Sequence, residues 1–217
     1  MEWLPGRLLG KQLTAGNLRK MGALFAALHA HSATWQPPAG FSQRRFDRLF
    51  ARGEPVALLD PPVVEACPPG GADIIRQARE RVDAAYAAIN PADLRVIHCD
   101  LWHDNIKVHQ GRLRPFDFED TIWGYRLHDI AMAMLDLHET AGFDRYEALL
   151  AEFKLGYAAR MEWPAGDMEA LQMGRMLWKL NYIARFHRDG LAGYVPFFVT
   201  LCERFLATGR VLPPLRP

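Results

Sequence analysis

Cysteine is scarce in this chain, which has 217 residues and three cysteines. Cys67, Cys99 and Cys202 are odd in number and form no C-x-x-C pair, so neither a disulfide framework nor a four-cysteine zinc site is indicated. This usage favours reduced thiols and a cytoplasmic protein.

An excess of charge of one sign is also lacking, because 26 Lys and Arg stand against 25 Asp and Glu, with a formal net charge of +1. The chain is 50% hydrophobic and 24% charged, a composition that excludes a disordered chain. It gives no sign of a surface for nucleic acid. Repeats and low-complexity segments do not occur.

Long apolar runs are missing as well. The longest uncharged apolar stretch, residues 191–202, is shorter than the roughly 20 residues that a membrane-spanning helix needs. Glu2 and Arg7 interrupt the N-terminal residues, which have no apolar core of a signal peptide. We therefore expect a protein that has no membrane partner.

The most informative stretch covers residues 94–137. Three short runs, 94–98, 105–109 and 112–116, are too short for helices and predict strands, and the first two carry β-branched residues. Polar residues collect where these strands end, and strand ends are rigid supports that aim side chains at a ligand.

The order of these polar residues predicts phosphoryl transfer. His98, Asp100 and Asn105 form H-x-D-x-x-x-x-N, and Asp117 begins a D-F-E triplet after the next strand. Phosphoryl transfer needs a carboxylate to accept the proton of the attacking hydroxyl, and oxygen ligands that hold Mg2+ on the phosphates. A single Asp or Asn in a loop is usually a turn former, but four polar residues in this order favour the catalytic interpretation.

The stretch resembles the kinase-like phosphotransferases, a group of aminoglycoside phosphotransferases, choline kinases and type II homoserine kinases with the protein-kinase fold. The resemblance implies an α+β, mainly α fold like the large C-terminal lobe of these enzymes, with a small β-hairpin in its catalytic segment. It implies that Asp100 is the catalytic base, that His98 braces its loop, and that Asn105 and Asp117 hold Mg2+. Asp129, at the start of the next helix, would buttress the loop.

One departure from the resembled group lies inside the loop itself. Cys99 stands where its small-molecule kinases commonly have glycine. Cysteine is small, so we expect the loop to tolerate it.

The N-terminal residues extend the resemblance. Met1, Glu2 and Trp3, followed by a Leu-Pro-Gly turn, resemble the hinge between the two lobes, whose backbone binds the adenine of ATP. We expect residues 1–16 to be a hinge remnant and residues 17–217 to be the C-terminal catalytic lobe. A frayed N-terminal strand is the alternative.

Two parts of a complete kinase are not found in the sequence. It has neither a G-x-G-x-x-G segment nor a lysine on a strand like that of V-A-I-K, and kinases use both to hold the phosphates. We therefore expect the small N-terminal lobe to be absent, and a missing lobe or a second copy of the chain to cover the apolar hinge face.

Residues for the acceptor are less sharply indicated. Glu119, in a D-F-E-D form that resembles the homoserine-kinase branch, would assist the metal or contact a substrate amine, or would be an ordinary exposed carboxylate. Trp123 would wall the acceptor pocket or pack in the core. Tyr182 lies with Trp178 and His187 near one face of a predicted helix, and would contact the substrate.

The leading hypothesis is therefore an ATP-dependent phosphotransferase. It would transfer the γ-phosphoryl group to a hydroxyl of a small substrate such as an aminoglycoside, an amino alcohol or a homoserine-like compound; ATP versus GTP stays open. A non-catalytic kinase-like binding module is one alternative. The other is a metal-dependent phosphohydrolase that uses the pairs His103-Asp104 and His128-Asp129.

The rest of the chain is expected to be a helical scaffold. Apolar periodicity and capping residues predict an irregular, proline-rich connector over residues 53–71, a short basic helix capped by Ser42, and longer helices over residues 17–32, 73–89, 126–140, 144–163, 167–188 and 196–208.

Overall fold

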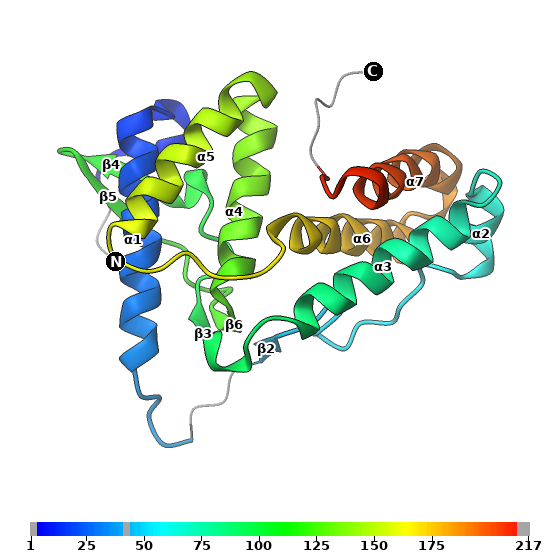
Figure 1. Ribbon diagram of the computed structural model, residues 1–217, viewed down its shortest axis with the longest axis horizontal. Coiled ribbons are helices and arrows are strands. Elements are labelled where there is room, and N and C mark those ends of the chain that lie inside the picture. The colour runs from blue at the N-terminus through cyan, green and yellow to red at the C-terminus, as the bar shows by residue number, and fades with distance from the viewer. Residues whose placement is uncertain (1–3, 41–43, 212–217) are drawn as a thin grey trace. The chain divides into compact units, whose positions relative to one another are not determined.

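The computed structural model describes residues 4–40 and 44–211, which form two compact units. Among the described residues, the first unit contains 4–40, 44–45 and 91–165, and the second contains 46–90 and 166–211, so that the boundary falls within the strand Arg45–Phe46. Figure 1 shows the elements of both units.

The first unit combines three long helices with two small sheets. Its helices are α1 (Ala15–Thr34), α4 (Arg126–Ala141) and α5 (Phe143–Ala158). One sheet has the order β1-β4-β5, with β1 (Arg7–Leu8), β4 (Ile106–His109) and β5 (Arg112–Pro115). The other has the order β2-β6-β3, with β2 (Arg45–Phe46), β6 (Ile122–Tyr125) and β3 (Leu94–Ile97). Short 3-10 turns are η1 (Leu9–Gln12), η2 (Pro91–Asp93) and η3 (His103–Asn105).

Helices α1 and α5 lie side by side (Figure 1) because glycines let their backbones approach closely. A Cβ atom at Gly22 would collide with the carbonyl of Phe153, and one at Gly156 would collide with the carbonyl of Arg19. The buried face of α1 recurs every three or four residues, as expected for an amphipathic helix; it consists of Leu18, Met21, Gly22, Phe25, Ala26 and His29.

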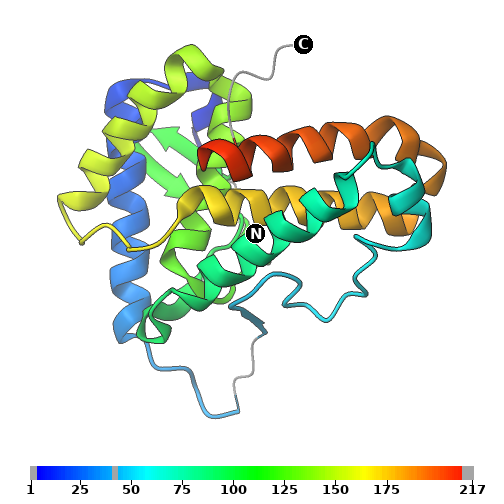
Figure 2. The same ribbon diagram turned by 45° about the vertical axis from the view of Figure 1, so that its right-hand side comes forward.

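The second unit is helical and has an apolar core. It contains α2 (Pro61–Ala66), α3 (Gly71–Ala87), α6 (Met168–Phe186), η4 (Arg188–Gly190) and α7 (Leu191–Thr208). Helices α3, α6 and α7 pack against one another (Figure 2). Their buried faces are rich in Leu, Val, Ile and Phe, whose removal from water stabilises the unit.

Helix α7 and the turn before it are longer than the apolar run in the sequence. Among the described residues, the segment 188–208 has the length and the apolar composition that a membrane-spanning helix needs. In the structure, 39% of its apolar 18-residue stretch is buried. Val195, Phe198, Cys202 and Phe205 lie on its buried face, and a core helix of a folded unit has this pattern.

The three strands predicted around the catalytic loop are confirmed to within one residue at each end. The N-terminal segment also contributes a strand, because Arg7 pairs with Val108 and Leu8 with Lys107.

Several helix boundaries differ from the predictions. Helix α1 begins two residues before the predicted start at residue 17, and it is capped by Thr14, whose hydroxyl accepts the N–H of Asn17 at 3.3 Å. Helix α3 begins two residues before the predicted start at residue 73; Gly70 precedes it with a left-handed φ of 78°, and Asp73 lies in its first turn. The last three helices were predicted over residues 144–163, 167–188 and 196–208, and they are observed over residues 143–158, 168–186 and 191–208.

The segment between the first two long helices also differs. The described residues after Ser42, which itself lies outside the described part, contain the strand β2 and turns instead of a basic helix. The proline-rich connector contains α2, with Pro61 in its first turn, a position where proline suits a helix because no N–H is needed there.

Candidate active site

The candidate site is built on the loop between β3 and β4, in the first unit. Cys99 has a φ of 69° and Asp117, which follows β5, has a φ of 65°. Non-glycine residues in this left-handed region are strained by about 1–2 kcal/mol and persist only where other contacts hold them. Both loops at the site therefore have backbones that the surrounding contacts hold in place.

Asp100 and Asn105 are in direct contact. The Nδ2 atom of Asn105 donates to Oδ2 of Asp100 at 2.7 Å and to the backbone carbonyl of Asp100 at 2.8 Å. Asn105 is 8% exposed and ends η3, where its N–H donates to the carbonyl of Trp102 at 3.0 Å. Because Nδ2 faces Asp100, the Oδ1 atom of the amide lies on its other side and can serve as an oxygen ligand.

The segment around Asp117 is tied to the same loop. The N–H of Phe116 donates to the carbonyl of Asn105 at 3.1 Å, and Nε2 of His98 lies 3.1 Å from the carbonyl of Phe116. The His98 ring also packs on Phe118, with 4.5 Å between centroids. Asp117 thus lies between two residues that are held in place, with an exposed side chain.

Asp129 lies beneath the loop and is 2% exposed. Its Oδ1 accepts the N–H of Cys99 at 2.7 Å, and its Oδ2 lies 3.0 Å from Nε2 of His29. Burial opposes the ionised form, but the hydrogen bond and charge of His29, with the N–H of Cys99, hold the pKa of Asp129 below its usual value. Asp129 is therefore an ionised acceptor below the loop.

His29 was not among the predicted site residues. It lies on the buried face of α1, 1% exposed, and a histidine on an apolar helix face is usually a core residue. The helical periodicity of α1 placed it inside the protein, but nothing local in the sequence connected it to Asp129.

The segment expected to form the hinge is only partly described. Met1, Glu2 and Trp3 lie outside the described residues. The Nζ atom of Lys107 donates to the carbonyl of Leu4 at 2.8 Å, so the residues that follow Trp3 are held on β4, the strand that begins directly after Asn105.

Two predicted acceptor residues lie on the first unit. Glu119 is exposed, in the turn after Asp117. Trp123 is half-buried on β6, opposite Val96 of β3, and its N–H donates to the carbonyl of Arg44 at 3.1 Å. Their roles remain predictions.

Tyr182 belongs to the second unit. It is 44% exposed on α6. Its ring centroid lies 5.8 Å from that of Trp178, on which it stacks, 4.9 Å from that of Phe186 and 5.7 Å from that of His187. The expected aromatic face of this helix therefore exists, while a substrate contact of Tyr182 remains a prediction.

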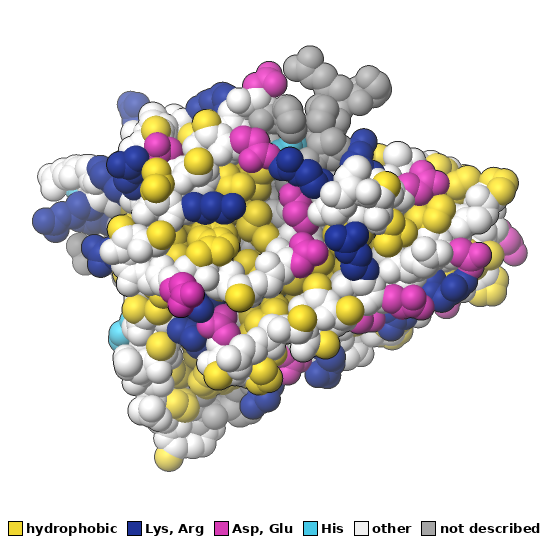
Figure 3. All heavy atoms as spheres, viewed as in Figure 1, with side chains coloured by type: hydrophobic (Ala, Val, Ile, Leu, Met, Phe, Trp, Pro, Cys, Tyr) yellow, Lys and Arg dark blue, Asp and Glu magenta, His cyan; other side chains and the backbone are white. Residues whose placement is uncertain are grey.

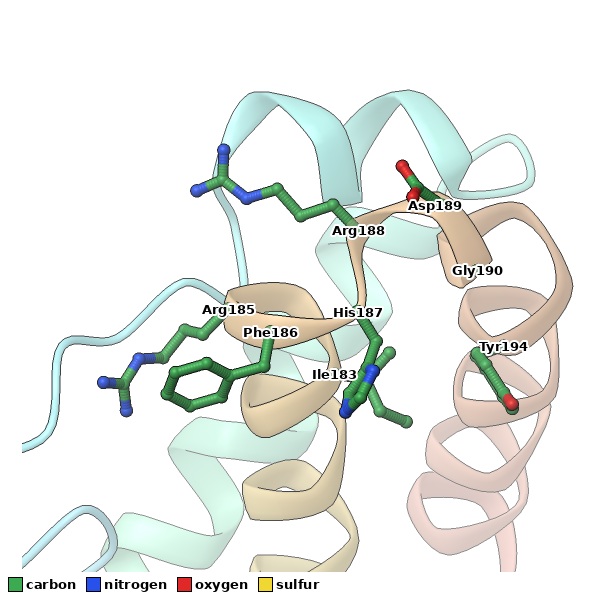
Figure 4. Close-up of a pocket in the computed structure, with 8 residues that line it drawn as sticks. All are labelled: Ile183, Arg185, Phe186, His187, Arg188, Asp189, Gly190 and Tyr194. Carbon is green, nitrogen blue, oxygen red and sulfur yellow. The ribbon is translucent and has the colours of Figure 1, made fainter.

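A hollow in the second unit adjoins this aromatic face, at the turn between α6 and α7. Figure 4 shows the side chains of Ile183 and His187 on one side and Tyr194 on the other, whereas Arg188 and Asp189 point outward. Because specific sites need polar groups that converge on the ligand, this hollow does not define a binding site.

The histidine-aspartate pairs of the phosphohydrolase hypothesis have other partners. His103 is buried with Nε2 3.0 Å from the hydroxyl of Thr140, and burial lowers its pKa. Asp129 is engaged by His29 and Cys99. Among residues 4–40 and 44–211, no three His, Cys, Asp or Glu side chains are grouped to hold a metal ion, and a transition-metal hydrolase site needs such a group.

The helical scaffold and the hairpin beside the loop define the large lobe of a kinase-like fold. The chain belongs to the APH phosphotransferase enzyme family, whose family model matches residues 1–166.

Solved structures agree with this fold. An amicoumacin kinase in complex with AMP-PNP and Ca2+ has a TM-score of 0.68 at 15% identity, over 98% of this chain and 65% of that one. A microcompartment-associated aminopropanol kinase has a TM-score of 0.68 at 21% identity, over 92% of this chain and 65% of that one. A choline/ethanolamine kinase family protein from Mesorhizobium loti has a TM-score of 0.60 at 19% identity, over 96% and 68%.

This chain therefore spans about two thirds of the length of these kinases. A comparison with curated proteins finds no match.

Proposed function

We propose that this chain carries the catalytic lobe of an ATP-dependent kinase that phosphorylates a hydroxyl of a small molecule. Asp100 accepts the proton of the attacking hydroxyl, and Asn105 and Asp117 hold Mg2+. The protein acts in the cytoplasm, and residues 1–16 precede the lobe as the nucleotide hinge.

The observation that carries the proposal is the contact between Asp100 and Asn105. The 2.7 Å hydrogen bond from Nδ2 of Asn105 to Oδ2 holds the carboxylate of Asp100 in one orientation. A base whose carboxylate is held in one orientation has less freedom to lose when the hydroxyl approaches.

The donor set fits magnesium. Mg2+ prefers oxygen ligands and usually takes one or two carboxylates, with the phosphates and water completing its shell. The exposed carboxylate of Asp117 and the Oδ1 atom of Asn105 are such ligands, and two protein oxygens suffice for an ion that phosphates also hold. When bound, Mg2+ would neutralise the charge that develops on the transferred phosphoryl group.

The hairpin next to the loop supports an anionic co-substrate. The register places Lys107 opposite Arg114 and His109 opposite Arg112, and dark blue side chains gather around this end of the first unit in Figure 3. Like charges directly opposite destabilise a strand pair. The phosphates of a nucleotide would offset this repulsion.

For the acceptor, we propose a hydroxylated amine of the aminoglycoside or amino-alcohol class. Proteins of similar fold include, by their descriptions, an aminopropanol kinase, a choline/ethanolamine kinase family protein and an aminoglycoside phosphotransferase in complex with hygromycin B. Glu119, which follows Asp117 in the same turn of the first unit, is the side chain that we propose to contact it.

The test is a phosphotransfer assay with ATP or GTP, Mg2+ and a panel of aminoglycosides, amino alcohols and homoserine. We expect Asp100→Asn to lower turnover by about 100- to 10,000-fold, the usual contribution of a general base, with nucleotide binding retained. Asp144→Asn, on the exposed start of α5 in the same unit, is the matched control. Phosphotransfer that survives Asp100→Asn would refute the assignment, and nucleotide binding without turnover would favour the binding-module alternative.

A further inference from the structure

The segment before helix α1 lies directly against the end of the candidate catalytic loop, within the first unit. Residues 4–10 contain β1 and the start of η1, and they contact residues 103–108, which contain η3 and most of β4. We call residues 4–10 the hinge strap, because they belong to the proposed nucleotide hinge.

Hydrogen bonds hold part of the hinge strap along β4. The Nζ atom of Lys107 donates to the carbonyl of Leu4 at 2.8 Å, and β1 pairs with β4 through Arg7 with Val108 and Leu8 with Lys107. A ladder of only two residue pairs is weak by itself. Packing therefore has to hold the strap as well.

Two glycines bring the strap closer to the loop than any side chain would permit. Gly6 precedes β1 with a φ of 125°, and a Cβ atom there would lie 2.6 Å from the carbonyl oxygen of Val108. Gly10 lies in η1, where a Cβ atom would collide with Oδ1 of Asp104 and would lie 2.6 Å from Cδ2 of His103. Because real Cβ atoms essentially never lie within 3.0 Å of another heavy atom, both positions favour glycine.

On the loop side, the side chain that Gly10 contacts is fixed in place. His103 is 1% exposed, its Nε2 atom lies 3.0 Å from the hydroxyl of Thr140 on α4, and its ring centroid lies 5.0 Å from that of Trp102. The half-buried carboxylate of Asp104 can turn away, but a buried ring in a close-packed interior cannot. A larger residue at position 10 would therefore push η1 and η3 apart.

Displacing η3 would move a proposed metal ligand. Asn105 is the last residue of η3; its N–H donates to the carbonyl of Trp102 at 3.0 Å, and its Nδ2 donates to Oδ2 of Asp100 at 2.7 Å. Its carbonyl accepts the N–H of Phe116, the residue before Asp117, at 3.1 Å. The strap thus packs on the short segment that carries one proposed metal ligand and is bonded to the neighbour of the other.

We propose that Gly6 and Gly10 lock the hinge strap to the catalytic loop, so that base binding at the hinge and metal binding at Asn105 and Asp117 strengthen each other. A base that orders the strap stabilises the position of η3 that binds the metal. The metal stabilises the strap in return, because coupling between two binding sites is reciprocal. The coupling rests on the proposed hinge and metal site, while the mechanical lock between the strap and the loop does not.

The competing explanation is that Gly10 only allows the first unit to pack. Gly22 has such a role, since a Cβ atom there would collide with the carbonyl of Phe153 between α1 and α5. If the two glycines were equivalent, replacing Gly10 would loosen the whole unit, as Gly22→Ala should, and would not act on residues 103–108 in particular.

Amide hydrogen exchange on the whole chain, without any ligand, tests the lock. Gly10→Ala should speed exchange of the amides of Asn105 and Phe116 by about 10-fold relative to those of α1 and α5, the scale of one lost hydrogen bond. Gly16→Ala, at an exposed glycine of α1 with open space around it, is the matched control and should not speed either amide. Gly22→Ala should speed exchange throughout the unit without selecting the loop.

Two further variants sharpen this test. Thr140→Val retains the shape of the side chain but removes the hydroxyl that holds His103, so it should speed exchange of the Asn105 amide by about 3-fold, and it keeps the test decisive if Gly10→Ala does not fold. Asp104→Ala removes one of the two groups that a Cβ atom at position 10 would meet. It should therefore restore part of the protection that Gly10→Ala loses.

Adenosine and Mn2+ test the coupling, because adenosine has no phosphate that could bind the ion directly. Electron paramagnetic resonance measures the free ion. Mn2+ should bind about 5-fold more tightly to the chain in the presence of saturating adenosine; Gly10→Ala should reduce this factor toward 1, and Gly16→Ala should retain it.

The outcomes separate the lock from the proposed function. The lock is refuted if Gly10→Ala affects Asn105 and Phe116 no more than it affects α1 and α5, or if Thr140→Val changes nothing at Asn105. The coupling is refuted if adenosine and Mn2+ both bind without changing each other's affinity. Failure of either to bind would overturn the proposed hinge or metal site, and the coupling with it, but not the exchange result.

Discussion

The two compact units bury different kinds of polar side chain. Among the described residues, the buried polar side chains of the first unit are His29, His98, His103, Asn105, His128, Asp129 and His138, whereas those of the second are Gln172 and Asn181. All the histidines and the carboxylate in this set therefore lie in the first unit, the unit of the candidate catalytic loop.

Burying an ionisable group costs free energy unless partners compensate for the lost water. In the second unit, apolar packing of α3, α6 and α7 stabilises the fold with little such cost. In the first unit, the partners of Asp129 and His98 are the backbone of Cys99 and of Phe116, which flank the candidate site. The difference indicates that buried ionisable groups in this protein hold the loop geometry, as clustered perturbed groups do at functional sites.

The largest effect should come from removing Asp129, the buried acceptor below the loop. Asp129→Ala leaves the N–H of Cys99 and the buried His29 ring without their acceptor, so we expect the first unit to lose about 3–5 kcal/mol of stability, as for a broken buried ion pair. Denaturant dependence of hydrogen exchange, followed in each unit, measures this loss. If the amides of α3 and α6 lost as much protection from exchange as those of α1 and α4, the stated difference between the units would be contradicted.

In the second unit, truncating a buried polar side chain should have only a local effect on stability. Asn181 is buried on α6, where Oδ1 accepts the N–H of Ala57 at 2.6 Å and Nδ2 donates to the carbonyl of Pro55 at 3.0 Å. Asn181→Ala should cost about 1–3 kcal/mol and should release the connector before α2. Limited proteolysis measures the release, and unchanged cleavage at residues 53–60 would contradict it.

Much of this architecture could be predicted from sequence because its signals are local. The strands around the loop follow from short β-branched runs, and the spacing of Asp100 and Asn105 placed two polar side chains at neighbouring strand ends, where they meet. Helix α4 follows from its apolar period.

What could not be predicted depends on contacts between distant residues. His29 and Asp129 are 100 positions apart, and no sequence pattern near either residue indicates that the two are in contact. The pairing of β1 with β4 rests on two residues, too few for a period. The positive φ of Cys99 appears only with the fold, which explains in physical terms why glycine suits this position in the resembled group.

The two units should also differ in their response to pH. The pKa of Asp129 is lowered in the folded protein, so its contribution to stability is present above the unfolded value of about 3.9 and is lost as the pH falls through the folded pKa. Burial raises the pKa of Cys202, on α7, from 9.0 to about 12, so its contribution is present below pH 9 and is lost as the pH rises toward 12.

Urea unfolding measured as a function of pH checks this difference. Asp129→Asn should flatten the acid side of the stability curve of the first unit, and Cys202→Ala should flatten the alkaline side of the second. If the two units of the unsubstituted protein lost stability equally at acid pH and at alkaline pH, the roles given to Asp129 and Cys202 would be contradicted.

The smallest effect should come from the hairpin charges. Arg114→Gln removes one of the opposed cations and should weaken nucleotide binding by about 2- to 5-fold at low salt, the scale of an exposed charge contact, with the difference shrinking as salt increases. Isothermal titration with ATP and Mg2+ at two salt concentrations measures it, and Arg19→Gln on the exposed surface of α1 is the control. A loss that does not depend on salt would argue against a phosphate contact.

The most direct test of the metal site uses Mn2+ in place of Mg2+, with a nucleotide and isotope-labelled protein, and does not require turnover. We expect paramagnetic broadening of the amide signals of residues 99–105 and 116–118, and weaker broadening in Asp117→Asn. Broadening that is absent there, or centred on another part of the chain, would contradict the claim that Asn105 and Asp117 hold the metal beside Asp100.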